Sequence, residues 1–257
     1  MRITVLGKSP AWPDTGGACS GYLIEDGDTR LLLDCGNGVF PKLRERCDYL
    51  EVDAVVLSHL HADHFLDLVP FSYALTLSPR QSAQRVRPVL HAPVGATETF
   101  RRVVGSWGNE DLIESAFEIV EYETSDTPRI GSLGLRLREV PHFITTHAID
   151  FTGADGGRFT FGADCGPNEA VVELATGTDL LFLEATITQP EAEGPRGHLT
   201  PGEAGEHARR TGAGRLVLTH ISDELDLDAA RRAAAETFGG DVEIAAEGAT
   251  YEVPSGA

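Results

Sequence analysis

The chain has 257 residues, of which 41% are hydrophobic and 24% charged, and its 40 acidic and 21 basic residues give a formal net charge of −19. This composition is typical of a globular protein, and the lack of any apolar run of 18 or more residues excludes a transmembrane helix. The acidity disfavours nucleic acid as a partner, because proteins bind that polyanion by neutralising phosphates with lysine and arginine.

The start of the chain and its cysteines indicate a reducing compartment. Residues 1–7 form a short strand pattern that ends at a glycine, without the apolar core and cleavage site of a signal peptide. The four cysteines form no CxxC pair, and a chain of this length can bury a full core without disulfides. We therefore expect a cytoplasmic protein with a single domain over residues 1–257 and no membrane association.

The predicted elements form two rounds of strands, each finishing in helices. In chain order, strands are predicted at 3–6, 22–24, 30–33, 54–57, 89–91, 117–122, 134–140, 148–151, 159–161, 180–184, 215–218 and 242–245. Helices are predicted at 65–77, at 97–104, from the capping sequence TPGE (200–203) to about Gly212, and at 229–238 after the cap Asp228. This order predicts an α/β sandwich with helices on both outer faces.

Most of the chemical information follows the strand predicted at 54–57. There the chain reads SHLHADH (58–64), which contains four potential metal ligands in six residues. His59 and His61 alternate by two and point to the same side of an extended chain, whereas Asp63 and His64 follow where the chain can turn toward a second metal. Imidazole and carboxylate ligands suit zinc, and also iron or manganese. A solvated polar loop is the alternative, but it leaves the density of ligands after a buried strand unexplained.

Three further ligand candidates follow predicted strands in the same way. They are His142, Asp164 and His220, each one to three residues after an apolar strand. Loops at a common edge of stacked strands would bring them to the SHLHADH segment. Taken alone, Asp164 could equally be a turn residue in its glycine-flanked loop.

This order of ligands resembles the metallo-β-lactamase superfamily and, more narrowly, its short ribonuclease Z-like branch. The matching segments are TVLG (4–7), GGACSGYL (16–23), LLLDCGNG (31–38), VLSHLHADH (56–64), LEAT (183–186), GHLT (197–200) and LTH (218–220). They recur in family order over nearly the whole chain. The resemblance implies an αββα four-layer sandwich in which two mixed β-sheets are flanked by helices.

The resemblance also implies a binuclear centre of two zinc ions, with manganese or iron as alternatives. The seven ligands would be His59, His61 and His142 for one ion, Asp63, His64 and His220 for the other, and Asp164 as the bridge. His147 is the rival of His142, but His142 comes directly after Val140-Pro141, where the family places its ligand.

The catalytic roles follow from this centre. Two zinc ions would lower the pKa of a shared water to give metal-bound hydroxide, and Asp63 would orient or deprotonate that water. Glu184 and His198 resemble the glutamate and histidine with which the family protonates the leaving oxygen; the alternatives are a surface acid and a plain loop histidine. Asp34 is expected to hydrogen-bond a ligand histidine.

The chain departs from true ribonuclease Z, which grips tRNA with a long arm inserted between the third ligand histidine and the bridging aspartate. Here Asp164 lies only 22 positions after His142, which leaves no room for an arm. One arginine-rich stretch could receive a phosphate or form a solvated basic face. Its members are Arg80, Arg85, Arg87, Arg101 and Arg102.

We therefore expect a zinc-dependent phosphodiesterase whose partner is a small-molecule phosphodiester or cyclic phosphate. The alternatives are a ribonuclease Z-like tRNA 3′ endonuclease, a lactonase or thioesterase, and a metal-binding sensor without turnover. β-Lactamases of this fold usually lack the bridging aspartate, so Asp164 argues against that activity. A homodimer is expected by analogy with the family alone.

Overall fold

Two seven-stranded sheets form the centre of the computed structural model, which describes residues 1–82, 86–254 and 256. The first sheet has the spatial order β14 (Thr250–Glu252), β1 (Arg2–Gly7), β2 (Gly21–Asp26), β3 (Thr29–Leu33), β4 (Ala54–Val56), β5 (Val89–Pro93) and β6 (Glu118–Tyr122). The second has the order β13 (Val242–Ile244), β12 (Leu216–Thr219), β11 (Leu180–Glu184), β10 (Arg158–Phe161), β9 (Thr146–Thr152), β8 (Leu133–Val140) and β7 (Arg129–Ile130). Both sheets contain parallel and antiparallel neighbours, as the family resemblance implies.

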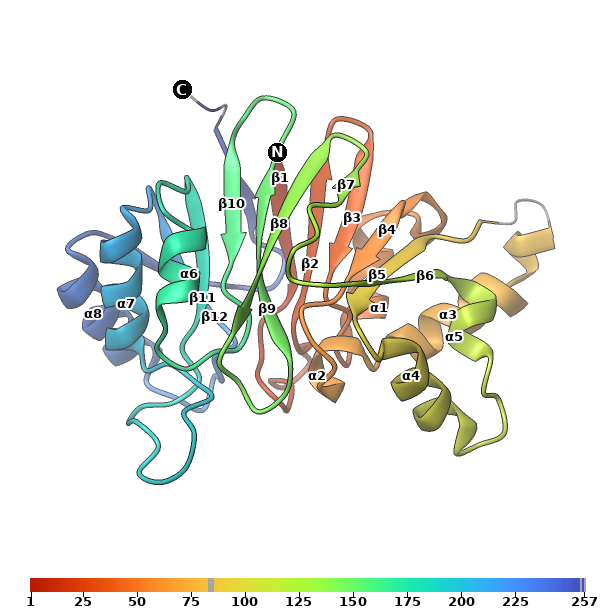
Figure 1. The fold of residues 1–257 in the computed structure, drawn as a ribbon, viewed down its shortest axis with the longest axis horizontal. Helices are drawn as coiled ribbons and strands as arrows, with labels where there is room; N and C mark the ends of the chain where they lie inside the picture. The colour runs from red at the N-terminus through yellow and green to blue at the C-terminus, as the bar shows by residue number, and fades with distance from the viewer. Residues whose placement is uncertain (83–85, 255, 257) are drawn as a thin grey trace.

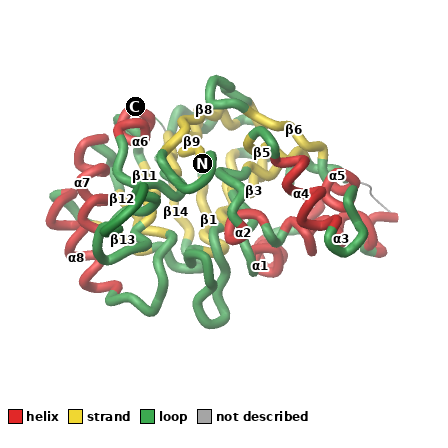
Figure 2. The backbone as a smooth tube through the Cα atoms, turned by 60° about the horizontal axis from the view of Figure 1, so that its bottom comes forward, coloured by secondary structure: helices red, strands yellow, loops and turns green. Residues whose placement is uncertain are grey.

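Helices cover the outer face of each sheet (Figures 1 and 2). The helices on the side of the first sheet are α1 (Val39–Arg46), α3 (Leu68–Leu77), α4 (Ala96–Gly105) and α5 (Leu112–Ala116), with the short α2 (Ala62–Phe65) and the 3-10 helices Tyr49–Glu51 and Pro79–Ser82 between them. The second sheet is covered by α6 (Glu169–Leu174), α7 (Pro201–Thr211) and α8 (Leu227–Phe238). These four layers confirm the predicted αββα sandwich. Among the described residues, no helix is long and apolar enough to cross a membrane.

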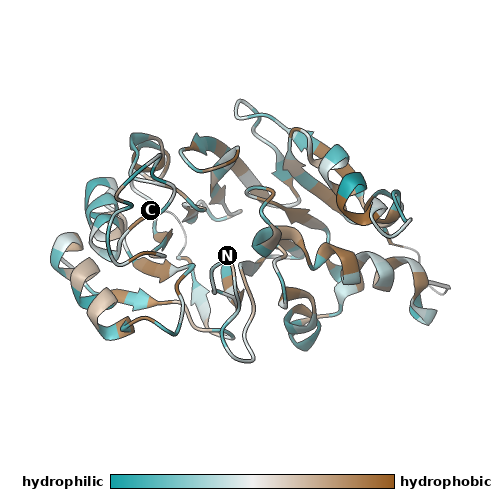
Figure 3. Ribbon diagram, turned by 90° about the horizontal axis from the view of Figure 1, so that it is seen from below, coloured by the Kyte–Doolittle hydropathy of each residue, from teal (hydrophilic) through white to brown (hydrophobic). Residues whose placement is uncertain are grey.

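The alternation of side chains along the strands divides the core into three layers. On β3, Leu31 faces the other sheet, whereas Leu32 packs toward the helices. On β11, Phe182 lies between the sheets and Leu183 packs toward α7. Strand side chains point alternately to the two faces, so a strand buried on both faces is apolar throughout. Figure 3 shows this as hydrophobic colour along the facing strands.

Strand directions determine where the functional loops gather. β10, β11 and β12 are parallel neighbours, and β8 has the same direction because β9 is antiparallel to both β8 and β10. β1, β3 and β4 likewise share one direction in the first sheet. The carboxyl ends of these strands meet at the edge where α2 lies, at the bottom of Figure 1.

The structure corrects two helix predictions. The helix predicted at 65–77 is two helices, because Asp67 donates its backbone N–H to the Cys35 carbonyl (3.0 Å) instead of continuing the helical hydrogen bonds. Asp228 is not the cap of α8. The carboxylate of Asp226 accepts the N–H of Ala229 (2.9 Å), so α8 begins two residues earlier than predicted.

The capping box predicted for α7 is present: the Thr200 hydroxyl accepts the Glu203 N–H, and the Glu203 carboxylate accepts the Thr200 N–H. The strand β14 was not predicted. It pairs antiparallel with β1, so that Arg2 lies opposite Glu252.

The packing of α7 on α8 generates a test of the fold. A Cβ added at Gly205 would lie 2.2 Å from the Ala234 carbonyl oxygen, whereas the nearest atom at Gly202 is 4.0 Å away. Gly205→Ala should therefore lower the free energy of unfolding by about 1–3 kcal/mol through overpacking. Gly202→Ala, the matched control, should leave it unchanged or raise it by less than about 1 kcal/mol. Urea unfolding measures both, and equal stability of the two variants would contradict this helix contact.

Candidate metal centre

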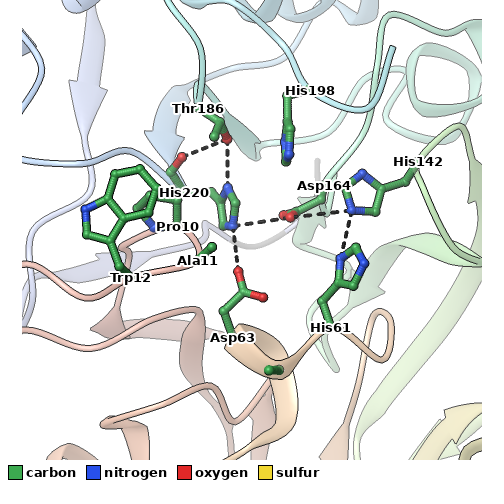
Figure 4. A pocket seen from close by; sticks show the side chains of 11 residues that line it. Pro10, Ala11, Trp12, His61, Asp63, His142, Asp164, Thr186, His198 and His220 are labelled. Carbon is green, nitrogen blue, oxygen red and sulfur yellow. Dashed lines mark hydrogen bonds and ion pairs between the residues drawn. The ribbon is translucent and has the colours of Figure 1, made fainter. Parts of the chain in front are cut away.

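The seven predicted metal ligands lie together at the edge where the strands of both sheets end. Their ligand atoms fall into two groups, and within each group they lie within 4.8 Å of one another. The groups are His59, His61 and His142, and Asp63, His64, Asp164 and His220. Figure 4 shows five of these side chains pointing toward one another: His61 and Asp63 come from one segment, and His142, Asp164 and His220 each come from another.

The first group consists of three imidazoles. His61 Nδ1 lies 3.1 Å from both His59 Nε2 and His142 Nε2. In a tetrahedral zinc site the Zn–N distance of 2.0–2.1 Å places ligand nitrogens about 3.3 Å apart, so this spacing fits a shared ion. Burial lowers the pKa of all three histidines, which keeps the rings neutral and their lone pairs available.

The second group combines carboxylates and imidazoles. His220 Nε2 lies 3.2 Å from both Asp63 Oδ2 and Asp164 Oδ2, and His64 Nε2 lies 3.4 Å from Asp164 Oδ1. Asp164 also reaches the first group, since its Oδ2 is 3.9 Å from the Nε2 of His59. The carboxylate of Asp164 therefore lies between the two groups, where a bridging ligand is expected.

Two buried atoms of this centre show what the protein side chains leave unsatisfied. His64 Nε2 and Asp164 Oδ1 have no hydrogen-bond partner among the described residues. Burial opposes a charge on His64, but the carboxylates of Asp164 and Asp34 outweigh it and raise the pKa of His64 well above its ordinary value. The site thus takes up a positive charge beside its carboxylates, and a metal cation would satisfy the same atoms. We conclude that the donor set fits a metal centre.

Asp34 orients His64, one of the predicted ligands, from the side away from the centre. Its fully buried carboxylate lies 2.8 Å from His64 Nδ1 and also accepts the Ser58 N–H (2.7 Å) and the Ser58 hydroxyl (2.8 Å). A histidine that donates through Nδ1 offers its Nε2 to a metal. The expected role of Asp34 is therefore matched by its geometry.

Backbone strain gathers in the same loops. Among the described residues other than glycine, only Asp34, Ala163 and His220 have positive φ angles, of 55°, 54° and 47°. Each lies just after the end of a strand: Asp34 follows β3, Ala163 follows β10 and His220 follows β12. Left-handed backbone is unfavourable for these residue types, so the surrounding structure must hold it. These sharp turns direct the Asp34, Asp164 and His220 side chains into the centre.

The structure separates His142 from its rival. The His147 ring lies outside both ligand groups, with Nε2 3.0 Å from the Thr124 hydroxyl and the ring against Tyr122. His142 Nδ1 donates to the Gly197 carbonyl (2.8 Å), which directs its Nε2 toward His61.

The two candidate proton-transfer residues contact each other. Glu184, the last residue of β11, is buried, and its Oε1 lies 2.9 Å from His198 Nδ1. Burial disfavours the charged form of His198, but the hydrogen bond and charge of Glu184 outweigh it and raise the pKa of His198 to about 9. Its ring lies beside those of His142 and His220, with centroids 5.1 and 5.7 Å away.

The loop that carries His198 is held by charged groups. The Glu191 carboxylate accepts the N–H groups of Gly197 and His198, both at 3.1 Å. Arg196 joins Glu191 (3.0 Å) to Glu203 (2.7 Å), the capping residue of α7. His198 is therefore positioned by the start of a helix as well as by Glu184.

A cavity of about 350 Å³ opens over the ligands. Besides residues of the centre, it is lined by Pro10, Ala11, Trp12, Ala62 and Thr186 (Figure 4). Nothing in the sequence predicted the segment 10–12 at this site, because Pro10, Ala11 and Trp12 have no ligand atoms. The segment reaches the cavity because it follows β1, whose carboxyl end lies at the same edge.

None of the described arginines of the arginine-rich stretch lines this cavity. Arg80 pairs with Asp48, and the Arg101 guanidinium pairs with the Glu114 carboxylate at 2.6 Å. Arg87 donates to the Glu114 carbonyl (2.7 Å), and Arg102 is exposed. Arg85 lies outside the described residues. These pairs favour the interpretation as a solvated face.

Comparisons with known proteins match this geometry. The sequence profile of the beta-lactamase superfamily domain matches residues 29–221. The chain is 28% identical to the probable metallo-hydrolase YhfI of Bacillus subtilis, over 98% of this chain and all of the relative. The crystal structure of YhfI superposes with a TM-score of 0.85 over 98% of this chain and 99% of the other, at 27% identity.

Two further relatives are similar over almost their whole length. Protein Rv1339 of Mycobacterium tuberculosis is 31% identical, over 98% of this chain and 92% of the relative. Ribonuclease Z of Halorubrum lacusprofundi is 29% identical, over 99% of this chain and 97% of the relative. That alignment extends over 308 positions, so the ribonuclease carries segments that this 257-residue chain lacks.

The assignment of the third histidine can be tested with a matched pair of variants. His142→Ala should lower the metal content of the purified protein, because it removes one of three imidazoles in the first group. His147→Ala should keep the full content, since that ring bonds to Thr124 instead. Elemental analysis after equal metal loading measures both. Metal loss from His147→Ala alone would reverse the assignment.

Proposed function

The chain belongs to the metallo-β-lactamase superfamily and is a metallo-hydrolase, and from this we propose that it is a binuclear zinc-dependent phosphodiesterase acting on a small phosphodiester or cyclic phosphate. The observation that carries the proposal is the arrangement of seven ligand side chains next to the Glu184–His198 pair, under one cavity. Manganese or iron could replace zinc with the same ligands.

One ion would be held by His59, His61 and His142, the other by Asp63, His64 and His220, with Asp164 between them. When bound, such a pair supplies the Lewis acidity that activates a water molecule and stabilises negative charge on the attacked group. The protein positions the ligands beforehand, through Asp34 behind His64 and the Gly197 carbonyl behind His142.

The protein's own acid and base groups lie around the cavity. Asp63 lines it, and the hydrogen bond from His220 lowers the pKa of the Asp63 carboxyl although burial opposes this. As a carboxylate it can orient the attacking water and accept its proton. On the other side, His198 lines the cavity. Glu184 stabilises its protonated ring through the hydrogen bond at Nδ1, and the ring can donate its Nε2 proton to a leaving alkoxide.

The size and charge of the cavity support a small substrate. Among the described residues that line it, none is a lysine or arginine, so a chain of phosphates would find no partners beyond the metals. Between β9 and β10 the chain turns tightly, with Gly153 N–H donating to the Gly157 carbonyl (3.0 Å), so that no arm extends from this point. These features favour a single phosphodiester over tRNA.

The first test of this proposal is hydrolysis of bis(p-nitrophenyl) phosphate before and after chelation. We expect cleavage that a chelator abolishes and added zinc restores, measured by release of p-nitrophenolate together with elemental analysis. Cleavage of lactones or thioesters, with no cleavage of phosphodiesters by the metal-loaded protein, would select acyl chemistry instead.

The role of His198 can be tested through the leaving group. His198→Ala should keep its metals but lose about 100-fold or more in kcat on a phosphodiester with an alkoxide leaving group, which needs a proton. The loss should be much smaller with p-nitrophenolate, which departs without one. Equal losses on both substrates, or a drop in metal content, would refute the proton-donor role. His147→Ala is the control histidine outside the site.

A further inference from the structure

An exposed aromatic side chain forms one wall of the cavity. Trp12, in the loop after β1, lines the cavity although 52% of its surface is exposed. Figure 4 places it beside His220 and Asp63, across the cavity from His142. Its neighbours Pro10 and Ala11 line the same wall, so this side of the cavity is apolar. Metal binding does not explain the exposed indole, because Trp12 does not belong to either group of predicted metal ligands.

The loop of Trp12 is fixed to the segment that follows His220. Lys8 Nζ, largely buried, pairs with Asp14 and donates to the Ile221 carbonyl (2.8 Å). Asp14 in turn accepts the N–H of Asp223 (3.0 Å), and the Ile221 N–H donates to the Lys8 carbonyl (3.1 Å). Both ends of segment 8–14 are therefore bonded to the segment that follows His220. These bonds hold the indole at the cavity.

A second exposed aromatic ring lies on the side of His142. Phe143 is 52% exposed, and its ring centroid lies 4.9 Å from that of His142 and 5.8 Å from that of His198. A Cβ at Gly197 would lie 2.4 Å from this ring, so the loop of His198 packs directly against it. Aromatic surface thus borders the ligand cluster on the side of His142 as well.

We propose that Trp12 is a specificity-determining residue that stacks on a planar heterocyclic ring of the substrate, and that the substrate is a phosphodiester carrying a nucleobase, such as a nucleoside cyclic phosphate. This inference rests on the proposed phosphodiesterase function. With no lysine or arginine among the described lining residues, the phosphate is left to the metals, and the rest of the substrate meets mainly apolar and aromatic surface. Indole faces stack on bases with little preference for sequence.

The kinetic test compares two substrates of equal charge: a purine nucleoside 3′,5′-cyclic phosphate and 1,3-propanediol cyclic phosphate, which carries no nucleobase. In Trp12→Ala, the ratio of kcat/KM for the nucleoside substrate to that for the base-free substrate should fall about 10- to 100-fold, mainly through KM. Trp12→Phe should restore part of the ratio. Trp107→Ala, which removes the other tryptophan from the α4–α5 connection and does not touch the cavity lining, should leave the ratio unchanged. An unchanged ratio in Trp12→Ala would overturn the inference.

Fluorescence gives a readout that does not depend on turnover. In Trp107→Phe, Trp12 is the only remaining tryptophan, and its emission should be quenched saturably by adenosine 5′-monophosphate but not by ribose 5-phosphate. Base-dependent quenching without any phosphodiester hydrolysis would refute the proposed function and keep the aromatic subsite. Hydrolysis without base-dependent quenching would do the reverse, and the lack of such quenching in an inactive protein would refute both.

Discussion

Charge balance at the carboxyl ends of the strands is the constraint on which the rest of this structure depends. Histidine rings and carboxylates that are mostly buried meet in one place, and two of their atoms form no hydrogen bond within the part of the chain that the structure describes. Such a cluster is unfavourable without a cation, because unpaired polar atoms lose their water and gain nothing in return. The rest of the fold therefore holds these donor groups in position for a metal. The region of the donor groups does not itself stabilise the fold.

The directions of the strands bring these side chains together at one edge of the sandwich. Because β4, β8, β10 and β12 deliver their following loops to one edge, each ligand needs only a short loop and a sharp turn to reach the centre. The positive φ angles at Asp34, Ala163 and His220 show where these turns are forced. The strands on both sides hold these turns in place. The hydrogen bonds of Asp34 and Glu184 fix the rings of His64 and His198.

That the predicted ligand side chains would gather at one edge could be foreseen, because their signal is local: each belongs to a short polar segment that follows an apolar strand. The features that could not be predicted depend on distant partners. The break between α2 and α3 comes from the Cys35 carbonyl, which takes the Asp67 N–H from another loop. Asp226 and Asp228 are equivalent as caps in sequence, and the structure shows Asp226 in that role. Trp12 carries no ligand chemistry, so only the cavity reveals it.

The pairing of β14 with β1 has a consequence for how the chain folds during synthesis. β1 leaves the ribosome long before its partner at Thr250–Glu252, because most of the sequence lies between the two strands. Throughout that interval one side of β1 presents unpaired N–H and C=O groups, the type of edge to which strands of other molecules add. The charged Arg2 on this edge hinders such addition, and the returning strand finally closes the edge from within the same molecule.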